Sequence, residues 1–149
     1  MSKLKIYDSM LCKKVLFEPI DPKNIRVYAC GPTVYDYAHI GNARMAVVFD
    51  TFVRLLRELY GKVIYVSNIT DIDDKIIERS KKEKESVHSI TNKFFKIYND
   101  DMEMLNVMKP DYQPKATEFV EKMISAISKL EEKKFAYHAE GNIIFDVSK

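Results

Sequence analysis

The stretch IRVYACGPTVYDYAHIGNARMAVVFDTFVRLLRELYGKVIYVSNIT occupies residues 25–70 and holds two β-prone segments on either side of a helical one. The first segment, residues 25–30, is β-branched, aromatic and apolar, and it ends at Gly31-Pro32, which is typical of a buried strand that runs into a loop. Residues 62–70 form the second segment. A strand, a long helix and a strand within about 45 residues form a βαβ unit, whose strands are parallel. The stretch therefore predicts an α/β fold with an open parallel sheet.

The segment between these strands predicts one long helix, which begins near residues 39–41 and continues to about Tyr60. Apolar residues recur at helical spacing, so we expect a single buried stripe on this helix. The residues of the stripe are Val48, Phe52, Leu55, Leu56 and Leu59. Charged residues, among them Asp50 and Arg54 at helical pair spacing, occupy the other face, and Gly61 ends the helix.

Shorter elements flank this unit. Residues 4–20 hold two β-prone stretches that predict a hairpin. Downstream, Ser86 is placed to cap a long amphipathic helix, and a second amphipathic helix follows Pro114. Near the end, the Glu-Gly-Asn of residues 140–142 separates two β-prone pieces and predicts a further hairpin. The composition changes near Pro110, which predicts a boundary there.

The two strand ends are the expected place for a ligand, because open α/β sheets bind ligands beyond the carboxyl ends of their strands. These ends are Gly31 with its loop and residues 68–71. The loop leads into the long helix, and the N–H groups and partial positive charge of a helix N-terminus favour phosphate. Gly41 would let a nucleotide approach the backbone closely, and His39 adds a hydrogen-bond donor. The sequence thus predicts a nucleotide site at this edge.

Composition sets broad limits on function. The chain has 149 residues, of which 46% are hydrophobic and 31% charged, which is a globular balance. Its 24 basic and 22 acidic residues give a net charge of +2, so no strong positive field indicates nucleic acid. No apolar run approaches the ~20 residues of a membrane span, and the start has no apolar signal core. We expect a cytoplasmic protein without a membrane partner.

Two long motifs carry a resemblance to a known family. His39-Ile40-Gly41-Asn42 resembles the HIGH signature of class I aminoacyl-tRNA synthetases, with Asn42 in place of the last histidine. Residues 30–36, CGPTVYD, and residues 68–76, NITDIDDKI, resemble the cysteinyl-tRNA synthetases in particular. The resemblance covers essentially the whole chain. It implies a Rossmann-like open parallel sheet, the first half of a class I catalytic domain, over residues 1–110, and the start of an inserted connective subdomain over residues 111–149.

The resemblance also implies roles for individual residues. His39 and Asn42 would be catalytic, and ATP would contact His39, Gly41 and Asn42. The pocket for L-cysteine would be lined by Cys30, Gly31, Thr33 and Thr70. Cys30 would also be one ligand of a zinc ion that takes the thiolate of the substrate. A thiolate binds zinc well and a serine hydroxyl poorly, so the metal would discriminate between the two amino acids.

The implied reaction is attack of the cysteine carboxylate on the α-phosphorus of ATP, which gives cysteinyl-adenylate and pyrophosphate. Transfer of the cysteinyl group to tRNA(Cys) follows, and Mg²⁺ is expected on the phosphates. The implied partners are therefore L-cysteine, ATP and tRNA(Cys), and a monomer is favoured. The family's other zinc ligands and its lysine-rich KMSKS loop have no counterpart in this sequence, so we expect these residues alone to be inactive.

Several residues have a structural interpretation beside the functional one. A lone cysteine after a strand is ordinarily a small hydrophobic residue, but the position of Cys30 before Gly-Pro inside the longer motif favours ligation. Cys12 has no such setting. Asp71, Asp73 and Asp74 form an acidic cluster that could hold Mg²⁺. We favour structural roles for the last two, because Thr70-x-x-Asp73 fits a capping pattern and acids in a first turn complement the helix dipole.

Other assignments stay open at this point. The basic run of residues 79–84 is interpreted as a solvated helix face, with a tRNA contact as the alternative, while His88 and His138 have no functional setting. Ligases that join cysteine to an amino sugar resemble the family in the same motifs. A non-catalytic module that binds a nucleotide or cysteine is a third possibility.

Overall fold

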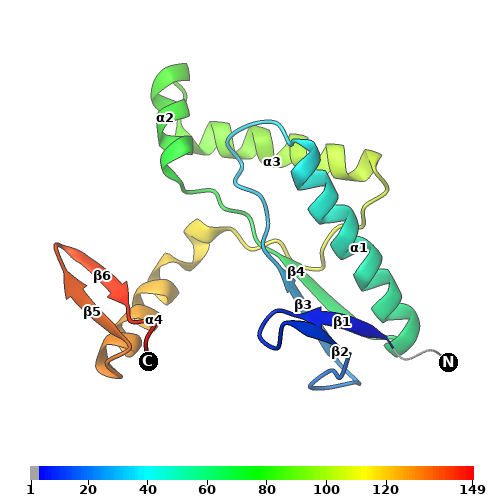
Figure 1. The fold of residues 1–149 in the computed structure, drawn as a ribbon. Coiled ribbons are helices and arrows are strands. Elements are labelled where there is room, and N and C mark those ends of the chain that lie inside the picture. The colour runs from blue at the N-terminus through cyan, green and yellow to red at the C-terminus, as the bar shows by residue number, and fades with distance from the viewer. Residues whose placement is uncertain (1–3) are drawn as a thin grey trace. The chain divides into compact units, whose positions relative to one another are not determined.

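A computed structural model describes residues 4–149, and the predicted hairpins, strands and helices are present in it (Figure 1). The strands are β1 (Lys5–Asp8), β2 (Lys13–Leu16), β3 (Ile25–Ala29), β4 (Val63–Ser67), β5 (Ala136–Ala139) and β6 (Asn142–Phe145). The helices are α1 (Ile40–Tyr60), α2 (Asp74–Glu83), α3 (Val87–Met104), a 3₁₀ turn (Ala116–Phe119) and α4 (Val120–Glu132). In residues 4–149, no helix has the length and apolarity to cross a membrane.

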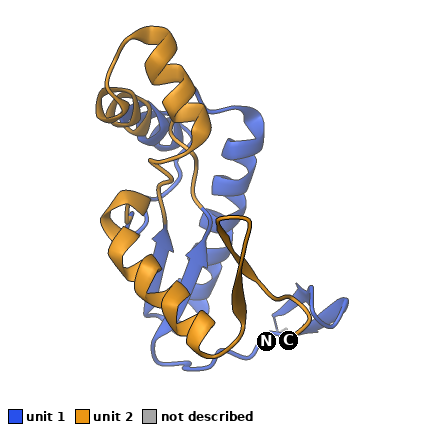
Figure 2. Cartoon of the chain, turned by 90° about the vertical axis from the view of Figure 1, so that its left-hand side faces the viewer, with its two compact units in different colours: residues 1–30, 37–67, 96–113 blue, residues 31–36, 68–95, 114–149 orange. Residues whose placement is uncertain are grey.

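The chain forms two compact units, and each is assembled from three separate stretches (Figure 2). Unit 1 comprises the residues up to 30 together with residues 37–67 and 96–113. Unit 2 comprises residues 31–36, 68–95 and 114–149. The chain therefore passes between the units at both strand ends and within α3. The division between a catalytic-domain half, residues 1–110, and a connective subdomain, residues 111–149, stays a prediction.

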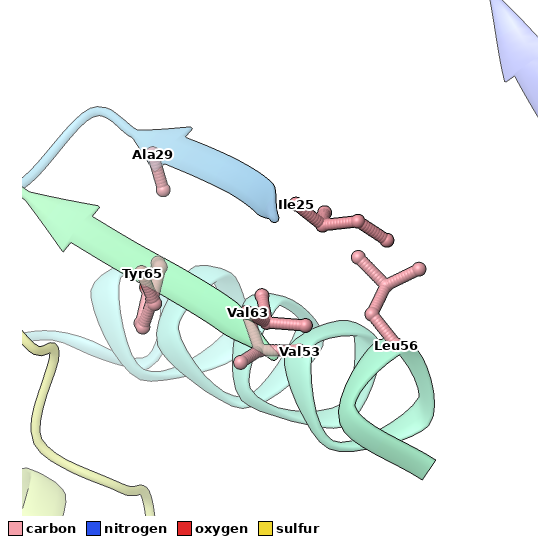
Figure 3. Close-up of a cluster of buried hydrophobic side chains, with 6 residues drawn as sticks. All are labelled: Ile25, Ala29, Val53, Leu56, Val63 and Tyr65. Carbon is pink, nitrogen blue, oxygen red and sulfur yellow. The ribbon is translucent and has the colours of Figure 1, made fainter. Parts of the chain in front are cut away.

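The βαβ prediction is confirmed in unit 1. β3 and β4 pair in parallel, with Ile25 opposite Val63 and Ala29 opposite Ser67. Helix α1 connects the two strands and packs against them. Figure 3 shows the six buried side chains of this contact, which are Ile25, Ala29, Val53, Leu56, Val63 and Tyr65. The hydrophobic contact between the helix and the strand pair thus holds the carboxyl ends of both strands at one edge.

The predicted apolar stripe of α1 is correct for Leu56 and Phe52, which lie in or against the core, and wrong for its other members. The residues of α1 that are buried are Ala46, Asp50, Val53 and Leu56. Three members of the predicted stripe are instead exposed, namely Val48 (57%), Leu55 (41%) and Leu59 (46%). The helix is apolar over more than one face, so periodicity alone did not select the face that meets the strands. Contact with the strand pair, which is centred on Val53 and Leu56, determines which face of α1 is buried.

Asp50 is a second correction, because it was placed on the solvated face and is only 7% exposed. Its carboxylate accepts a hydrogen bond from the Nε of Arg54 at 2.8 Å, which confirms the predicted pair, and another from the backbone N–H of Met108 at 3.0 Å. The Nη2 of Arg54 also donates to the carbonyl of Asn106. A buried carboxylate is tolerated here because its oxygens are hydrogen-bonded. The network fastens the segment after α3 to α1.

Parallel pairing continues beyond the named strands in short bridges. Within unit 1, Val66 bridges Tyr112, and within unit 2, Thr33 bridges Thr70 and Ile69 bridges Lys115, all in parallel. The named strands of the described chain nevertheless pair only in twos. The α/β character is thus confirmed, while the wider open Rossmann-like sheet stays a prediction.

Candidate amino-acid and nucleotide site

Thr33 and Thr70, two residues of the predicted cysteine pocket, face each other across a parallel bridge in unit 2. The N–H of Thr70 donates to the carbonyl of Pro32 at 3.0 Å, and the carbonyl of Thr70 accepts from the N–H of Val34 at 3.2 Å. Both backbone groups of Thr70 are therefore paired with the loop that follows β3. Only the half-buried side chain of Thr70 is left to meet a ligand.

Asn68 joins Thr70 to Gly31, a third residue of the predicted pocket. Its Oδ1 accepts a hydrogen bond from the N–H of Gly31 at 2.8 Å, and its Nδ2 donates to the Oγ1 of Thr70 at 3.4 Å. The sequence motif contained Asn68, but sequence reasoning assigned it no role. Its position as a polar residue directly after β4, at the strand ends where a ligand is expected, was the signal that could have found it.

Arg79 fastens the far end of the same loop. Its Nη1 donates to the carbonyl of Tyr35 at 2.8 Å and pairs with the carboxylate of Asp36 at 2.7 Å, while its Nε donates to Glu83. The guanidinium also lies over the ring of Phe94, 4.4 Å from the centroid. The hydrogen bond that Arg79 donates to Asp36 is the main cause of a raised pKa for Arg79. The basic run was interpreted as a solvated face, and in Arg79 it contains a residue that holds the loop.

The acidic cluster has structural partners. The buried carboxylate of Asp71 accepts from the N–H of Thr117 at 3.0 Å and from its hydroxyl at 2.6 Å. Asp73 caps α2 and accepts from the N–H of Lys75 at 2.9 Å. Asp74 lies in the first turn of α2, as the dipole argument predicted. The capping pattern was wrong in one respect, because the cap residue is Asp73 and not Thr70.

The predicted ATP residues form the N-terminus of α1 in unit 1. His39 is the N-cap, and its Nδ1 accepts a hydrogen bond from the N–H of Gly41 at 3.1 Å. The Oδ1 of Asn42 in turn accepts from the N–H of His39 at 3.1 Å. The backbone N–H groups of His39 and Gly41, which lie where the sequence predicted donors for a phosphate, are thus bonded within the cap. Because Nδ1 is the acceptor, the proton of the neutral imidazole is on Nε2, which remains a donor.

Gly41 has a steric role in this cap. A Cβ built on Gly41 would lie 2.8 Å from Cε1 and 2.9 Å from Nδ1 of the His39 ring, closer than real Cβ atoms approach. The imidazole therefore folds over the first turn only because position 41 carries no side chain. The close approach of a nucleotide to Gly41 stays a prediction.

Cys30 directly follows β3, and its thiol is exposed and not in a disulfide. Thiolate is a good zinc ligand, but a structural or substrate-binding zinc needs three or four protein ligands. Among residues 4–149, no group of three or more His, Cys, Asp or Glu side chains is arranged to hold a metal ion. Ligation of zinc by Cys30 therefore stays a prediction, and the described residues do not complete a zinc site.

The candidate residues are therefore divided between the units. Gly31, Thr33 and Thr70 belong to unit 2, and their mutual contacts are direct or through Asn68. Cys30, His39, Gly41 and Asn42 belong to unit 1, where the last three form one cap. That the two groups share one cavity stays a prediction.

Comparison with known proteins fixes the family. A family model described as the class I (C) tRNA synthetase catalytic domain matches residues 16–149. The chain belongs to the class I tRNA synthetases. Among solved structures, this synthetase chain resembles a Campylobacter jejuni protein assigned as an arginyl t-RNA synthetase, with a TM-score of 0.66 and 16% identity over 86% of this chain and 38% of that one. At this identity, the similarity supports the fold alone.

Relatives of this class I synthetase chain are named cysteine–tRNA ligases. The protein from Hydrogenovibrio crunogenus is 52% identical over 145 residues, and the one from Rhodospirillum centenum is 46% identical over 144 residues. The Maricaulis maris protein is 49% identical over 150 residues. These matches cover 97–99% of this chain, which spans about a third (32%) of each relative. The resemblance noted in the sequence is confirmed.

Proposed function

We propose that residues 1–149 serve in a cysteine–tRNA ligase, which activates L-cysteine with ATP and transfers it to tRNA(Cys) in the cytoplasm. The observation that carries the proposal is the pairing of Gly31 and Thr70 through Asn68 at the strand ends, because these residues come from the two motifs that resemble cysteinyl-tRNA synthetases. The names of the relatives support tRNA, rather than an amino sugar, as the acceptor. The open Rossmann-like sheet belongs to the same proposal, as does the connective subdomain beginning at residue 111.

In this proposal the chain's own residues bind and orient the reactants. The side chains of Thr33 and Thr70 hold the polar end of the amino acid, since the backbone of Thr70 is already paired. The Nε2–H of His39 donates to a phosphate oxygen of ATP. Negative charge grows on the oxygens around phosphorus as the carboxylate attacks, so a positioned donor stabilises the transition state more than the ground state. Asn42 contributes first by holding the cap of α1.

The metal part of the proposal is limited to one residue of this chain. Cys30 would supply one thiolate ligand, and the other ligands would come from outside residues 4–149. When bound, zinc would distinguish a thiolate substrate from a hydroxyl one. Mg²⁺ would accompany the phosphates of ATP.

Cysteine-dependent ATP–pyrophosphate exchange by the complete gene product that contains residues 1–149 tests this function. We expect exchange with cysteine and not with serine, followed by charging of tRNA(Cys). The 149-residue chain by itself should show no useful exchange. Cys30→Ser should lower bound zinc and cysteine use together, whereas Cys12→Ser, at the exposed turn of the β1–β2 hairpin, should change neither.

Two results would overturn the proposal. Active exchange without tRNA charging, but with transfer to an amino sugar, would favour the other ligase class. Cysteine or nucleotide binding without any exchange would favour a non-catalytic binding module. Unchanged zinc content in Cys30→Ser would remove Cys30 from the metal site.

A further inference from the structure

We infer that Asn68 is a positioning residue of the cysteine pocket, and that its single side-chain amide sets the direction in which the Thr70 hydroxyl donates its hydrogen. The inference rests on the proposed function, because it assumes that Gly31 and Thr70 line the pocket. It goes beyond that function by assigning a role to a residue that needs no contact with the substrate.

The orientation of the amide is fixed by its stronger contact. The N–H of Gly31 is a donor, so the atom 2.8 Å from it must be the carbonyl oxygen of the Asn68 side chain and not its nitrogen. The nitrogen Nδ2 then faces the Oγ1 of Thr70 at 3.4 Å and can only donate. Gly31 thus determines what Asn68 presents to Thr70.

This contact constrains the hydroxyl of Thr70. A hydroxyl has one hydrogen and two acceptor lone pairs, and Nδ2 of Asn68 uses one lone pair. The hydrogen of Thr70 must therefore point away from Asn68. It is available to an acceptor on a bound amino acid, and no reorientation is needed when the ligand arrives. Donors oriented in advance bind more tightly because the binding equilibrium does not include the cost of ordering them.

The backbone around Asn68 is anchored independently of its side chain. Ile69 donates to the carbonyl of Pro114 at 2.8 Å and accepts from the N–H of Ala116 at 2.9 Å. Thr70 is paired in both directions with the loop after β3. Removal of the Asn68 amide therefore leaves these four backbone bonds in place. Its effect should appear in the pocket and not in the fold.

Two variants of Asn68 separate its two contacts. Asn68→Leu keeps the branched shape of the side chain, is somewhat larger, and removes both contacts. Asn68→Asp keeps an acceptor for the N–H of Gly31 but presents only acceptor oxygens to Thr70, so the Thr70 hydroxyl must turn and donate to the carboxylate. Thr70→Val removes the hydroxyl. Asn142→Asp, which changes an exposed amide beside the β5–β6 turn, is the matched control.

The kinetic experiment is ATP–pyrophosphate exchange on the complete gene product. Asn68→Leu and Asn68→Asp should each raise the KM for cysteine about tenfold, with the KM for ATP changed less than about twofold. In the Thr70→Val background, Asn68→Asp should have less than about a twofold effect, because no hydroxyl remains to be turned. Asn142→Asp should match the parent. Equal rises in both KM values, or an undiminished Asn68→Asp effect without the hydroxyl, would overturn the inference.

Amide hydrogen exchange on the complete gene product tests the contact without any activity. In Asn68→Leu the N–H of Gly31 should exchange at least about tenfold faster, while the N–H of Val34, which is bonded to Thr70, should be unchanged. Unchanged protection of Gly31 would refute the contact. If the parent protein showed no cysteine-dependent ATP–pyrophosphate exchange at all, the proposed function would fail. The hydrogen-exchange result would still decide whether Asn68 holds Gly31.

Discussion

Replacement of Gly41 by alanine should weaken ATP use and leave the fold almost as stable as before. The new Cβ would lie 2.8–2.9 Å from two atoms of the His39 ring. The clash involves the end of a side chain that can rotate, so the imidazole should swing away and the helix should stay intact. The hydrogen bond from the N–H of Gly41 to Nδ1 would then be lost.

Two opposing terms set the change in the free energy of unfolding. Alanine is better than glycine within a helix by roughly 1 kcal/mol. Loss of one cap hydrogen bond costs about 1 kcal/mol. The net change should thus lie within about 1 kcal/mol of zero. Catalysis has no such compensation, because a transition-state donor at phosphate is worth about 10²-fold or more in rate. A displaced His39 should therefore lower kcat for exchange by at least about tenfold.

Gly61, at the other end of the same helix, provides the control. Its φ is +80°, and a Cβ there would meet nothing within 4 Å. Gly61→Ala should lower the free energy of unfolding by about 1–2 kcal/mol through backbone strain alone, with kcat unchanged. Urea unfolding and exchange kinetics, measured on both variants, form a crossed test. A Gly41→Ala protein with normal kcat, or with a loss of stability as large as that of Gly61→Ala, would refute the reasoning.

Two further predictions concern buried polar groups. Asp71→Ala should lower the free energy of unfolding by about 2 kcal/mol, because it removes two hydrogen bonds to a buried carboxylate. Thr117→Val should also lower it, because the buried Oδ2 of Asp71 loses its hydroxyl donor. Urea unfolding of both variants measures these losses. Burial raises the pKa of Tyr98 to about 12, with a smaller contribution from Tyr65. As the pH rises, the Tyr98 phenol should therefore lose its proton in the unfolded chain before it does so in the folded protein. The free energy of unfolding should fall as the pH rises from about 10 to 12. Tyr98→Phe should flatten this fall in pH-dependent unfolding, and an unchanged slope would contradict the assignment.

The order of elements could be predicted because it depends on local signals. Gly-Pro after residues 25–30 ended β3, Gly61 ended α1, and Glu140-Gly141 made the last turn, where both residues have positive φ. The buried face of α1 could not be predicted in the same way. Val48 and Leu55 are as apolar as Val53 and Leu56, and only the position of the strand pair decides which of them are covered.

The candidate site was predicted as a set of residues, but its internal contacts were not. Motif resemblance selected Gly31, Thr33 and Thr70, and the structure brings them together in unit 2. Asn68 and Arg79 were missed because their roles depend on partners 37 and 44 residues away along the chain. Sequence spacing within one element contains no information about such long-range pairs.

In the proposed function, the cap of α1 decides which donors remain for phosphate. The sequence suggested that the backbone N–H groups would bind phosphate, yet the N–H groups of His39 and Gly41 are occupied by Asn42 and by the imidazole. The N–H of Gly41 holds the ring with Nδ1 turned toward the first turn and Nε2 as the remaining donor, while Asn42 holds the backbone of His39. The backbone donor of Gly41 therefore acts by orienting the imidazole. In the proposed function, Asn42 would therefore affect ATP mainly by holding the backbone of His39, since its Oδ1 is engaged within the cap.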